Sequence, residues 1–174
     1  CKKSKRCISI NQAKKIILDL KKKISVVALF SNDEESHIKS VINNLNIDII
    51  QFHGDEIDSD CIKYNLPYIK GISASYNQLN NLDEEFPNAK AFILDSHSDD
   101  GLGGTGRTFD WSNSTFETAK PIMIAGGLNC DNVEDAIEVF LPYGVDVSSG
   151  VESDDGKKNL SLIKKFICKA KSKK

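Results

Sequence analysis

The sequence predicts an α/β protein in which helical crossovers cover a parallel β-sheet. Segments with apolar residues at helical spacing alternate along the chain with short apolar runs rich in β-branched residues. These runs are continuous and do not alternate with polar residues, so both faces of the sheet should be buried, as in parallel sheets. Two architectures meet these observations, an open doubly wound sheet and a (β/α)8 barrel.

The first half of the chain begins with an amphipathic helix. From Ala13, apolar residues recur at i, i+3, i+4 and i+7, and lysines occupy the opposite face. Ser31, Asn32 and Asp33 follow the first strand candidate and are typical of a helix start. The expected elements in this half are, in order, a helix at 11–23, a strand at 25–30, a helix at 34–45, a strand at 47–52, a short helix at 59–64 and a strand at 67–72.

The second half continues the same alternation after a polar stretch. A strand at 89–94 ends in Asp95, and Asn129 is the best cap candidate for the helix after the next strand. The last helix has one apolar face and many lysines, as expected for a solvated outer helix. The remaining expected elements are a strand at 120–125, a helix at 131–140, a strand at 144–147 and a helix at 160–170.

Polar or glycine-rich clusters stand directly after five of the six expected strands. In an open sheet the functional groups gather at one switch point, whereas in a barrel every strand ends at one shared mouth. The pattern therefore favours the barrel, although a complete barrel has eight strands. The clusters are Ser31-Asn32, His53-Gly54-Asp55, Asp95-Ser96, Gly126-Gly127 and Ser148-Ser149-Gly150.

The glycines after the last two strands predict phosphate binding. Gly126-Gly127 and Ser148-Ser149-Gly150 end consecutive strands, and glycine lets backbone N–H groups approach a phosphate closely. In barrels, the loops after the seventh and eighth strands commonly bind phosphate. The alternative is that both segments are ordinary tight turns between a strand and a helix.

The segment Gly101–Thr108 is one residue away from a P-loop, because Arg107 stands where that motif has lysine. As a P-loop it would make the chain a nucleotide-binding α/β module. That interpretation is disfavoured, since a guanidinium does not replace a lysine ammonium and residues 96–100 separate the glycines from the strand. A loop that closes over a bound substrate fits the segment better.

Composition limits the classes of function. The 174 residues carry a formal net charge of −2, whereas nucleic-acid-binding domains are usually basic, so no nucleic-acid partner is expected. No apolar run approaches the ~18 residues of a membrane span, so no membrane association is expected. The five cysteines include no Cys-x-x-Cys pair, which argues against a disulfide framework or zinc ribbon and favours a cytoplasmic location.

Six motifs occur in order over essentially the whole chain. They are Lys3–Ser9, Gln51–Glu56, Leu94–Ser96, Gly103–Trp111, Ala125–Asn129 and Val145–Glu152. Together they resemble phosphoribosylanthranilate isomerase, the (β/α)8 enzyme of tryptophan biosynthesis. The resemblance implies an intramolecular isomerase that interconverts an aldose and a ketose.

The same resemblance implies that residues 1–174 form a single barrel domain containing strands 3 to 8 of the barrel. The first strand, first helix and second strand of the family would then precede Cys1, and the chain does not open with Met. In the family the general base is a cysteine at the end of the first strand, in a Lys-x-Cys-Gly motif that these residues do not contain. We therefore expect the 174-residue chain alone to be inactive.

The implied reaction is an Amadori rearrangement of N-(5'-phosphoribosyl)anthranilate to 1-(o-carboxyphenylamino)-1-deoxyribulose 5-phosphate. A general acid protonates the ring oxygen and opens the furanose to a Schiff base, and a general base then removes the proton on C2. Asp95 is the expected acid, because barrel catalysis takes place at the C-terminal ends of strands. An aspartate there can instead cap a backbone N–H. No metal and no cofactor are expected.

Substrate-binding residues also follow from the resemblance. Arg6 is expected to bind the anthranilate carboxylate through its planar guanidinium, although an arginine in a basic run can also be merely solvated. Gln51, His53 and Asp146 are expected at the mouth of the barrel, with His53 in a binding or loop-organising role. The expected phosphate-binding residues are Gly104, Gly106, Gly126, Gly127, Ser148, Ser149 and Gly150.

Two hypotheses compete with the isomerase. One is a noncatalytic barrel remnant that keeps phosphosugar binding, and the other is the nucleotide-binding module built on Gly101–Thr108. The expected partner of the isomerase is a small-molecule phosphoribosyl substrate. The protein is expected to be a monomer or homodimer, either alone or fused to or acting beside another tryptophan-pathway enzyme.

Overall fold

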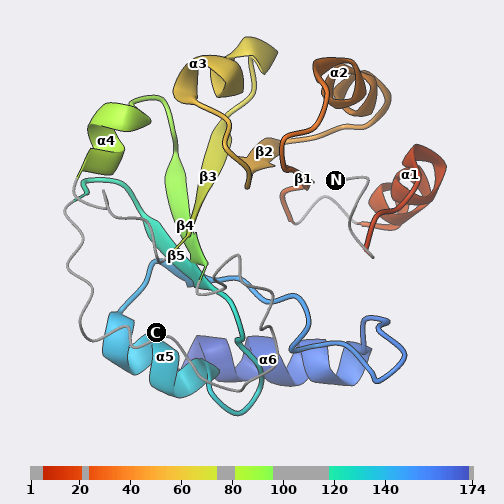
Figure 1. Ribbon diagram of the computed structural model, residues 1–174. Helices are drawn as coiled ribbons and strands as arrows, with labels where there is room; N and C mark the ends of the chain where they lie inside the picture. Colours follow the sequence, from red (N-terminus) through yellow and green to blue (C-terminus); the bar gives the residue numbers. More distant parts are fainter. Residues whose placement is uncertain (1–5, 21–23, 74–80, 96–117, 173–174) are drawn as a thin grey trace. The chain divides into compact units, whose positions relative to one another are not determined.

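The computed structural model describes residues 6–20, 24–73, 81–95 and 118–172. The chain divides into two compact units. The first contains Cys1–Gly71 and Asp83–Lys90, and the second contains Ile72–Leu82 and Ala91–Lys174. All strand pairs recorded within the units are parallel, which confirms the predicted α/β class (Figure 1).

The first unit has three parallel strands with helices between them. Strand β1 pairs with β2, and β2 pairs with β3. The boundary between the units falls within β3 and at the start of α4. The elements are α1 (Ile10–Asp19), β1 (Val27–Phe30), α2 (Glu35–Asn44), β2 (Ile49–Phe52), α3 (Asp58–Cys61), the short 3-10 helix η1 (Ile62–Tyr64), β3 (Tyr68–Ser73) and α4 (Leu82–Glu85).

Helix α1 is shorter than its sequence pattern predicts. It begins with a capping box, in which the Gln12 N–H donates to Ser9 Oγ at 3.2 Å and the Ser9 N–H donates to Gln12 Oε1 at 2.8 Å. It ends at Asp19, and Leu20 is already extended. The predicted end at residue 23 is therefore wrong, because the helical backbone stops before Leu20, and residues 21–23 lie outside the described residues.

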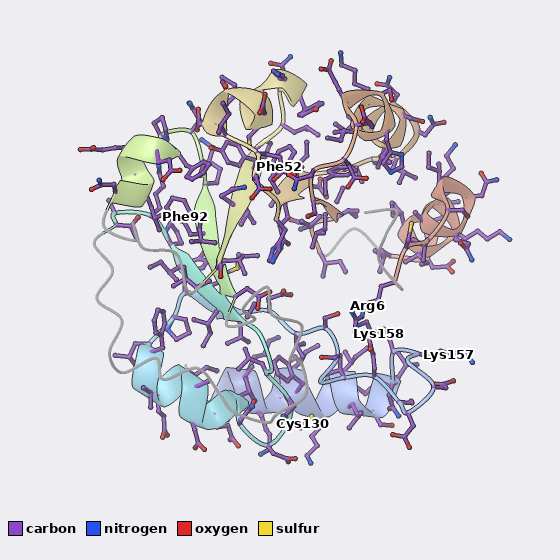
Figure 2. The ribbon with its side chains drawn as sticks, in the orientation of Figure 1. Arg6, Phe52, Phe92, Cys130, Lys157 and Lys158 are labelled. Atoms are coloured by element: carbon purple, nitrogen blue, oxygen red, sulfur yellow. The ribbon has the colours of Figure 1, made fainter. Side chains whose placement is uncertain are left out.

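Phe52 lies at the centre of the aromatic core of the first unit (Figure 2). Its ring centroid is 6.4 Å from that of Phe30 and 6.0 Å from those of Tyr64 and Tyr68. Because side chains alternate along a strand, Gln51 lies on the face of β2 opposite to Phe52. The helix-facing surface of this sheet therefore carries the aromatic rings together with Lys70, which pairs with Phe52, and the other face carries Gln51 among apolar residues.

Strand β1 is more exposed than the sequence predicts. Val27 and Leu29 are 43% and 45% exposed, so burial of both faces is wrong for this strand. The prediction is confirmed for residues 68–72 of β3 and for residues 91–94 of β4, which are buried throughout. An apolar groove runs beside β1, between α1 and α2, and its lining includes Phe30 and Val41.

The second unit also contains parallel strands and helices. Strand β5 pairs in parallel with β4 on one side and with β6 on the other. Helices α5 and α6 lie side by side (Figure 1), and Lys169 Nζ donates to Glu134 Oε2 at 2.7 Å between them. The elements are β4 (Ala91–Asp95), β5 (Ile122–Ala125), α5 (Val133–Phe140), β6 (Gly144–Val145) and α6 (Leu160–Ser172).

Two sequence predictions in the second unit need correction. Helix α5 is preceded by Asn132 as its N-cap residue, not by Asn129. Asn129 belongs to the turn before the helix, where its Oδ1 accepts a hydrogen bond from the Asp131 N–H at 2.7 Å. Strand β6 covers only Gly144–Val145, because the backbone after Val145 leaves the ladder to form the next loop.

Thiol reactivity provides a test of this burial pattern. Cys61 is fully buried, and burial raises its pKa to about 12, whereas Cys7 and Cys168 are exposed. At pH 8 the Cys61 thiolate should be about one part in ten thousand. We expect iodoacetamide to label Cys7 and Cys168 in the native protein but to label Cys61 only after unfolding, as read by peptide mass spectrometry. Equal native labelling at Cys7 and Cys61 would contradict this packing.

Candidate active site

The second unit aligns the ends of three strands. In the register of β4 and β5, Asp95 lies opposite Ala125, the residue before the glycine pair. The Asp146 N–H donates to Ile124 O at 2.8 Å, so the segment after β6 leaves the sheet at the same level. Asp95 is half-buried at the end of a strand whose four preceding residues are buried. Its carboxyl group thus stands at the C-terminal edge, as the sequence predicts.

Gly126 and Gly127 form the turn after β5. Their φ angles are +88° and +66°, values that favour glycine. Asn132 Nδ2 donates to Gly127 O at 3.0 Å, and Asn132 Oδ1 accepts from the Asn129 N–H at 2.8 Å. The N-cap residue of α5 therefore also fixes the backbone of the glycine turn.

The segment Ser148–Gly150 lies against this turn. Asn129 and Gly150 form a parallel bridge, and a side chain at Gly150 would overlap Leu128 O. Ser148 and Ser149 are exposed. Two backbone segments thus run next to each other at the ends of β5 and β6, with serine hydroxyls and glycine amides at their surface. This arrangement suits an anionic phosphate group.

Lys158 holds the Ser148 segment in place (Figure 2). Its ammonium donates to Ser148 O at 2.7 Å, to Ser148 Oγ at 3.2 Å and to Glu152 Oε1 at 2.7 Å. These three acceptors match the three N–H donors of a lysine. All three N–H groups of the ammonium are therefore used within the loop, although the side chain is 45% exposed.

In the first unit, Gln51 and His53 come from the end of β2. Gln51 is buried, and its Nε2 lies 3.3 Å from Nδ1 of His53. The Gln51 amide therefore lies within hydrogen-bond distance of the imidazole ring. Gly71 of β3 lies against the ring, since a Cβ there would overlap Nδ1. The His53 ring is thus held between Gln51 and Gly71.

The residues after His53 are tied to the end of β1. Asn32, at φ +53°, accepts a hydrogen bond from the Asp55 N–H at 2.8 Å and donates from Nδ2 to Asp55 Oδ2 at 2.9 Å. Glu56 Oε1 accepts from the Asn32 N–H at 2.6 Å. The loops after β1 and β2 therefore form one hydrogen-bonded structure.

The other predicted site residues are distributed as follows. Arg6 is exposed and lies just before α1. Gly104, Gly106 and the segment Gly101–Thr108 lie outside the described residues. The structure thus brings together Asp95, the Gly126-Gly127 turn, Asp146 and Ser148–Gly150 in the second unit, and Gln51 with His53 in the first.

Sequence reasoning missed three residues of this network. Lys70, Gly71 and Lys158 received no role, yet each contacts a loop that carries predicted site residues. A signal was present for Lys70, because it is the one charged residue in the apolar run Tyr68–Ser73. A lysine inside a buried strand needs buried partners and so indicates a polar network. Lys158 has no such signal, since it stands beside other polar residues.

The described residues hold neither a metal-ligand cluster nor a membrane-spanning helix. No group of three His, Cys, Asp or Glu side chains in the described ranges has the arrangement of a metal site. No helix in the described part of the chain is both long enough and apolar enough to span a membrane.

The contact at Gly150 yields a stability prediction. Gly150→Ala should destabilise the fold by about 1–3 kcal/mol, because the new methyl group would overlap the Leu128 carbonyl. Gly127→Ala is the matched control, since it has nothing within 4 Å and only its positive φ opposes the change, at about 1 kcal/mol. Urea unfolding of both variants measures the difference. A smaller loss at Gly150 than at Gly127 would contradict the close approach of the two segments.

Comparison with known proteins agrees with the predicted fold and family. The family model described as N-(5'phosphoribosyl)anthranilate (PRA) isomerase matches residues 1–169. An N-(5'-phosphoribosyl)anthranilate isomerase from Xanthomonas euvesicatoria pv. vesicatoria is 41% identical over 151 residues, which cover 83% of this chain and 68% of the relative.

Solved structures of such isomerases are also similar. Phosphoribosyl anthranilate isomerase from Thermotoga maritima is 36% identical with a TM-score of 0.79, covering 98% of this chain and 84% of that one. A complex with reduced 1-(o-carboxyphenylamino)-1-deoxyribulose 5-phosphate is 35% identical with a TM-score of 0.74, at 98% and 84% coverage. A monomeric form of the dimeric Thermotoga maritima isomerase is 34% identical with a TM-score of 0.74, at 98% and 83% coverage.

These matches confirm the predicted (β/α)8 fold class, and the described part of this chain contains six of its strands. The prediction that residues 1–174 are one domain stays a prediction. The chain belongs to the N-(5'-phosphoribosyl)anthranilate isomerase family.

Proposed function

We propose that this chain carries the general acid and the phosphate site for the rearrangement of N-(5'-phosphoribosyl)anthranilate to 1-(o-carboxyphenylamino)-1-deoxyribulose 5-phosphate. The observation that carries the proposal is the register of β4 and β5. It sets Asp95 opposite Ala125, directly before the Gly126-Gly127 turn. One edge of the second unit therefore offers a proton donor beside a backbone surface that suits a phosphate.

Asp95 acts on the ring oxygen of the substrate. Its proton passes to that oxygen, the bond from oxygen to C1 breaks, and the nitrogen lone pair forms the Schiff base. A base then takes the proton from C2, and the resulting enol-amine gains a proton at C1 and loses the proton of its C2 hydroxyl to give the ketone. The family resemblance assigns this base to a cysteine in a Lys-x-Cys-Gly motif, which residues 1–174 do not contain.

The proposal assigns a binding role to each predicted site residue, unit by unit. Gly126, Gly127 and the segment Ser148–Gly150 bind the phosphate through backbone N–H groups and hydroxyls. Asp146 faces the sugar next to them. In the first unit, Arg6 binds the anthranilate carboxylate, and Gln51 with His53 contacts the sugar or the ring. Gly104 and Gly106 are further proposed phosphate contacts, outside the described residues.

The decisive test replaces the acid. In the full-length protein that contains residues 1–174, Asp95→Asn should lower kcat by about 10²–10⁴-fold, because the amide cannot deliver a proton to the ring oxygen. The assay is the loss of the substrate's anthranilate fluorescence. Asp155→Asn, at an exposed position of the same unit, is the control and should leave the rate unchanged. Full activity of Asp95→Asn would refute the assignment.

The carboxylate site has its own test. Arg6→Met should weaken binding of reduced 1-(o-carboxyphenylamino)-1-deoxyribulose 5-phosphate by about 10–100-fold, the effect of losing a charge-assisted pair. Isothermal titration calorimetry measures the dissociation constant, and Lys14→Met on the exposed face of α1 is the control. An unchanged dissociation constant for Arg6→Met would move the carboxylate site elsewhere.

The lone chain tests the need for the base. Residues 1–174 assayed alone should show no turnover, since neither the family's base nor its motif is present. They should bind the reduced product more weakly than the full-length protein does, or not at all. Turnover at a rate near that of a complete family member would overturn the assignment of the base to an upstream cysteine. Binding without turnover by the full-length protein would instead favour the noncatalytic phosphosugar-binding alternative.

A further inference from the structure

Lys70 is a buried charge that the proposed reaction does not use. It lies in β3 and is 3% exposed. Its ammonium donates to Gly54 O at 2.5 Å and to Glu56 Oε2 at 3.2 Å, and it lies 5.4 Å from the centre of the Phe86 ring. A lysine this deeply buried has a large desolvation cost, which its partners in the protein must offset.

Glu56 is the second member of this network. Its side chain is 10% exposed, and both carboxylate oxygens are used. Oε1 accepts from the Asn32 N–H at 2.6 Å, and Oε2 accepts from the Gly54 N–H at 2.8 Å in addition to Lys70. Gly54 is therefore held on both sides, its N–H by Glu56 and its carbonyl by Lys70.

The position of Gly54 leaves little freedom. A Cβ at this residue would overlap the Asn32 side chain and backbone, so the loop lies directly against the end of β1. Gly54 immediately follows His53, whose N–H donates to Phe30 O at 2.8 Å. Fixing both polar groups of Gly54 therefore fixes the backbone that carries His53.

Lys70 lies on the face of the sheet opposite to the His53 ring. In the register of β2 and β3 it lies opposite Phe52, on the helix-facing side, where its Nζ lies over the Phe86 ring. Gln51 and Gly71 lie on the other face, and Gly71 contacts the His53 ring there. The ammonium and the imidazole are thus on opposite faces of the sheet and share the Gly54 backbone.

We propose that Lys70 and Glu56 are positioning residues for His53 and Gln51, acting through the backbone of Gly54. The pair sets where the imidazole of His53 stands at the end of β2 and so keeps the ring within reach of the Gln51 amide. Neither charge touches the substrate. The proposal rests on the proposed function for the role of His53 in substrate binding, but not for the geometry it predicts.

Three variants of the full-length protein separate positioning from stability. Lys70→Met removes the donor to Gly54 and leaves the Glu56 carboxylate buried without its ammonium partner, so it should lower stability. Adding Glu56→Gln removes the buried charge, and the double variant should recover most of that stability. Lys63→Met is the matched control, because it breaks an exposed lysine–aspartate pair in the same unit.

The readouts are kcat, KM and the 15N signals of the His53 ring and the Gly54 amide. Both Lys70 variants should raise KM by about tenfold or more with a smaller change in kcat, as expected for a displaced binding group. The 15N signals of their His53 ring should shift from those of the wild type. Lys63→Met should match the wild type. Recovery of KM and of the ring signals together with stability in the double variant would overturn the proposal and leave the pair a purely structural role.

The 15N measurements distinguish a failure of this positioning proposal from a failure of the proposed function. If the wild-type protein shows no turnover and no binding of the reduced product, the proposed function fails, and the 15N signals still test the geometry. If turnover is present but the His53 signals do not change in Lys70→Met, the function stands and the positioning role falls.

Discussion

The parallel register of the strands is the constraint on which the rest of this structure depends. A parallel ladder fixes which residues are level with each other, and all strands end at the same edge. In the second unit this places Asp95 beside the last residue of β5, and in the first unit it places Gly71 against His53. A slip of one residue would turn each of these side chains to the opposite face. The chemistry therefore follows from the ladder as much as from the residues themselves.

Close backbone contacts then hold the strand ends of each unit in a defined arrangement. Gly54, Gly71 and Gly150 each lie where a methyl group would overlap a neighbouring atom. Two of the three contacts involve loops at the strand ends, and all three bring segments from different strands together. Lys70 and Lys158 serve these loops in the same way, since each ammonium donates to a loop carbonyl and to a nearby glutamate. Charged groups thus stabilise the loop backbone at both places.

Much of this organisation could be predicted from the sequence. The strands and their order follow from continuous apolar runs, and Asp95 and the glycine segments follow from their places after those runs. The end of α1, the N-cap of α5 and the exposed face of β1 could not, because each depends on the folded backbone around it and not on residue spacing. Asn132 is the N-cap residue of α5 but makes no side-chain hydrogen bond to the helix, and its amide bonds to Gly127 O and to the Asn129 N–H instead. Helix α4 lies in a stretch that carries no helical apolar pattern and packs through Leu82.

The two hydrogen bonds that hold Gly54 also affect how a ligand would be bound at the end of β2. Ordering a residue of backbone costs about 1–2 kcal/mol in conformational entropy, and a mobile loop incurs this cost when the ligand arrives. Here both polar groups of Gly54 are already bonded within the protein, so the cost is met during folding. A ligand that contacts His53 would therefore bind a preorganised backbone. Its association would require no ordering of that part of the site.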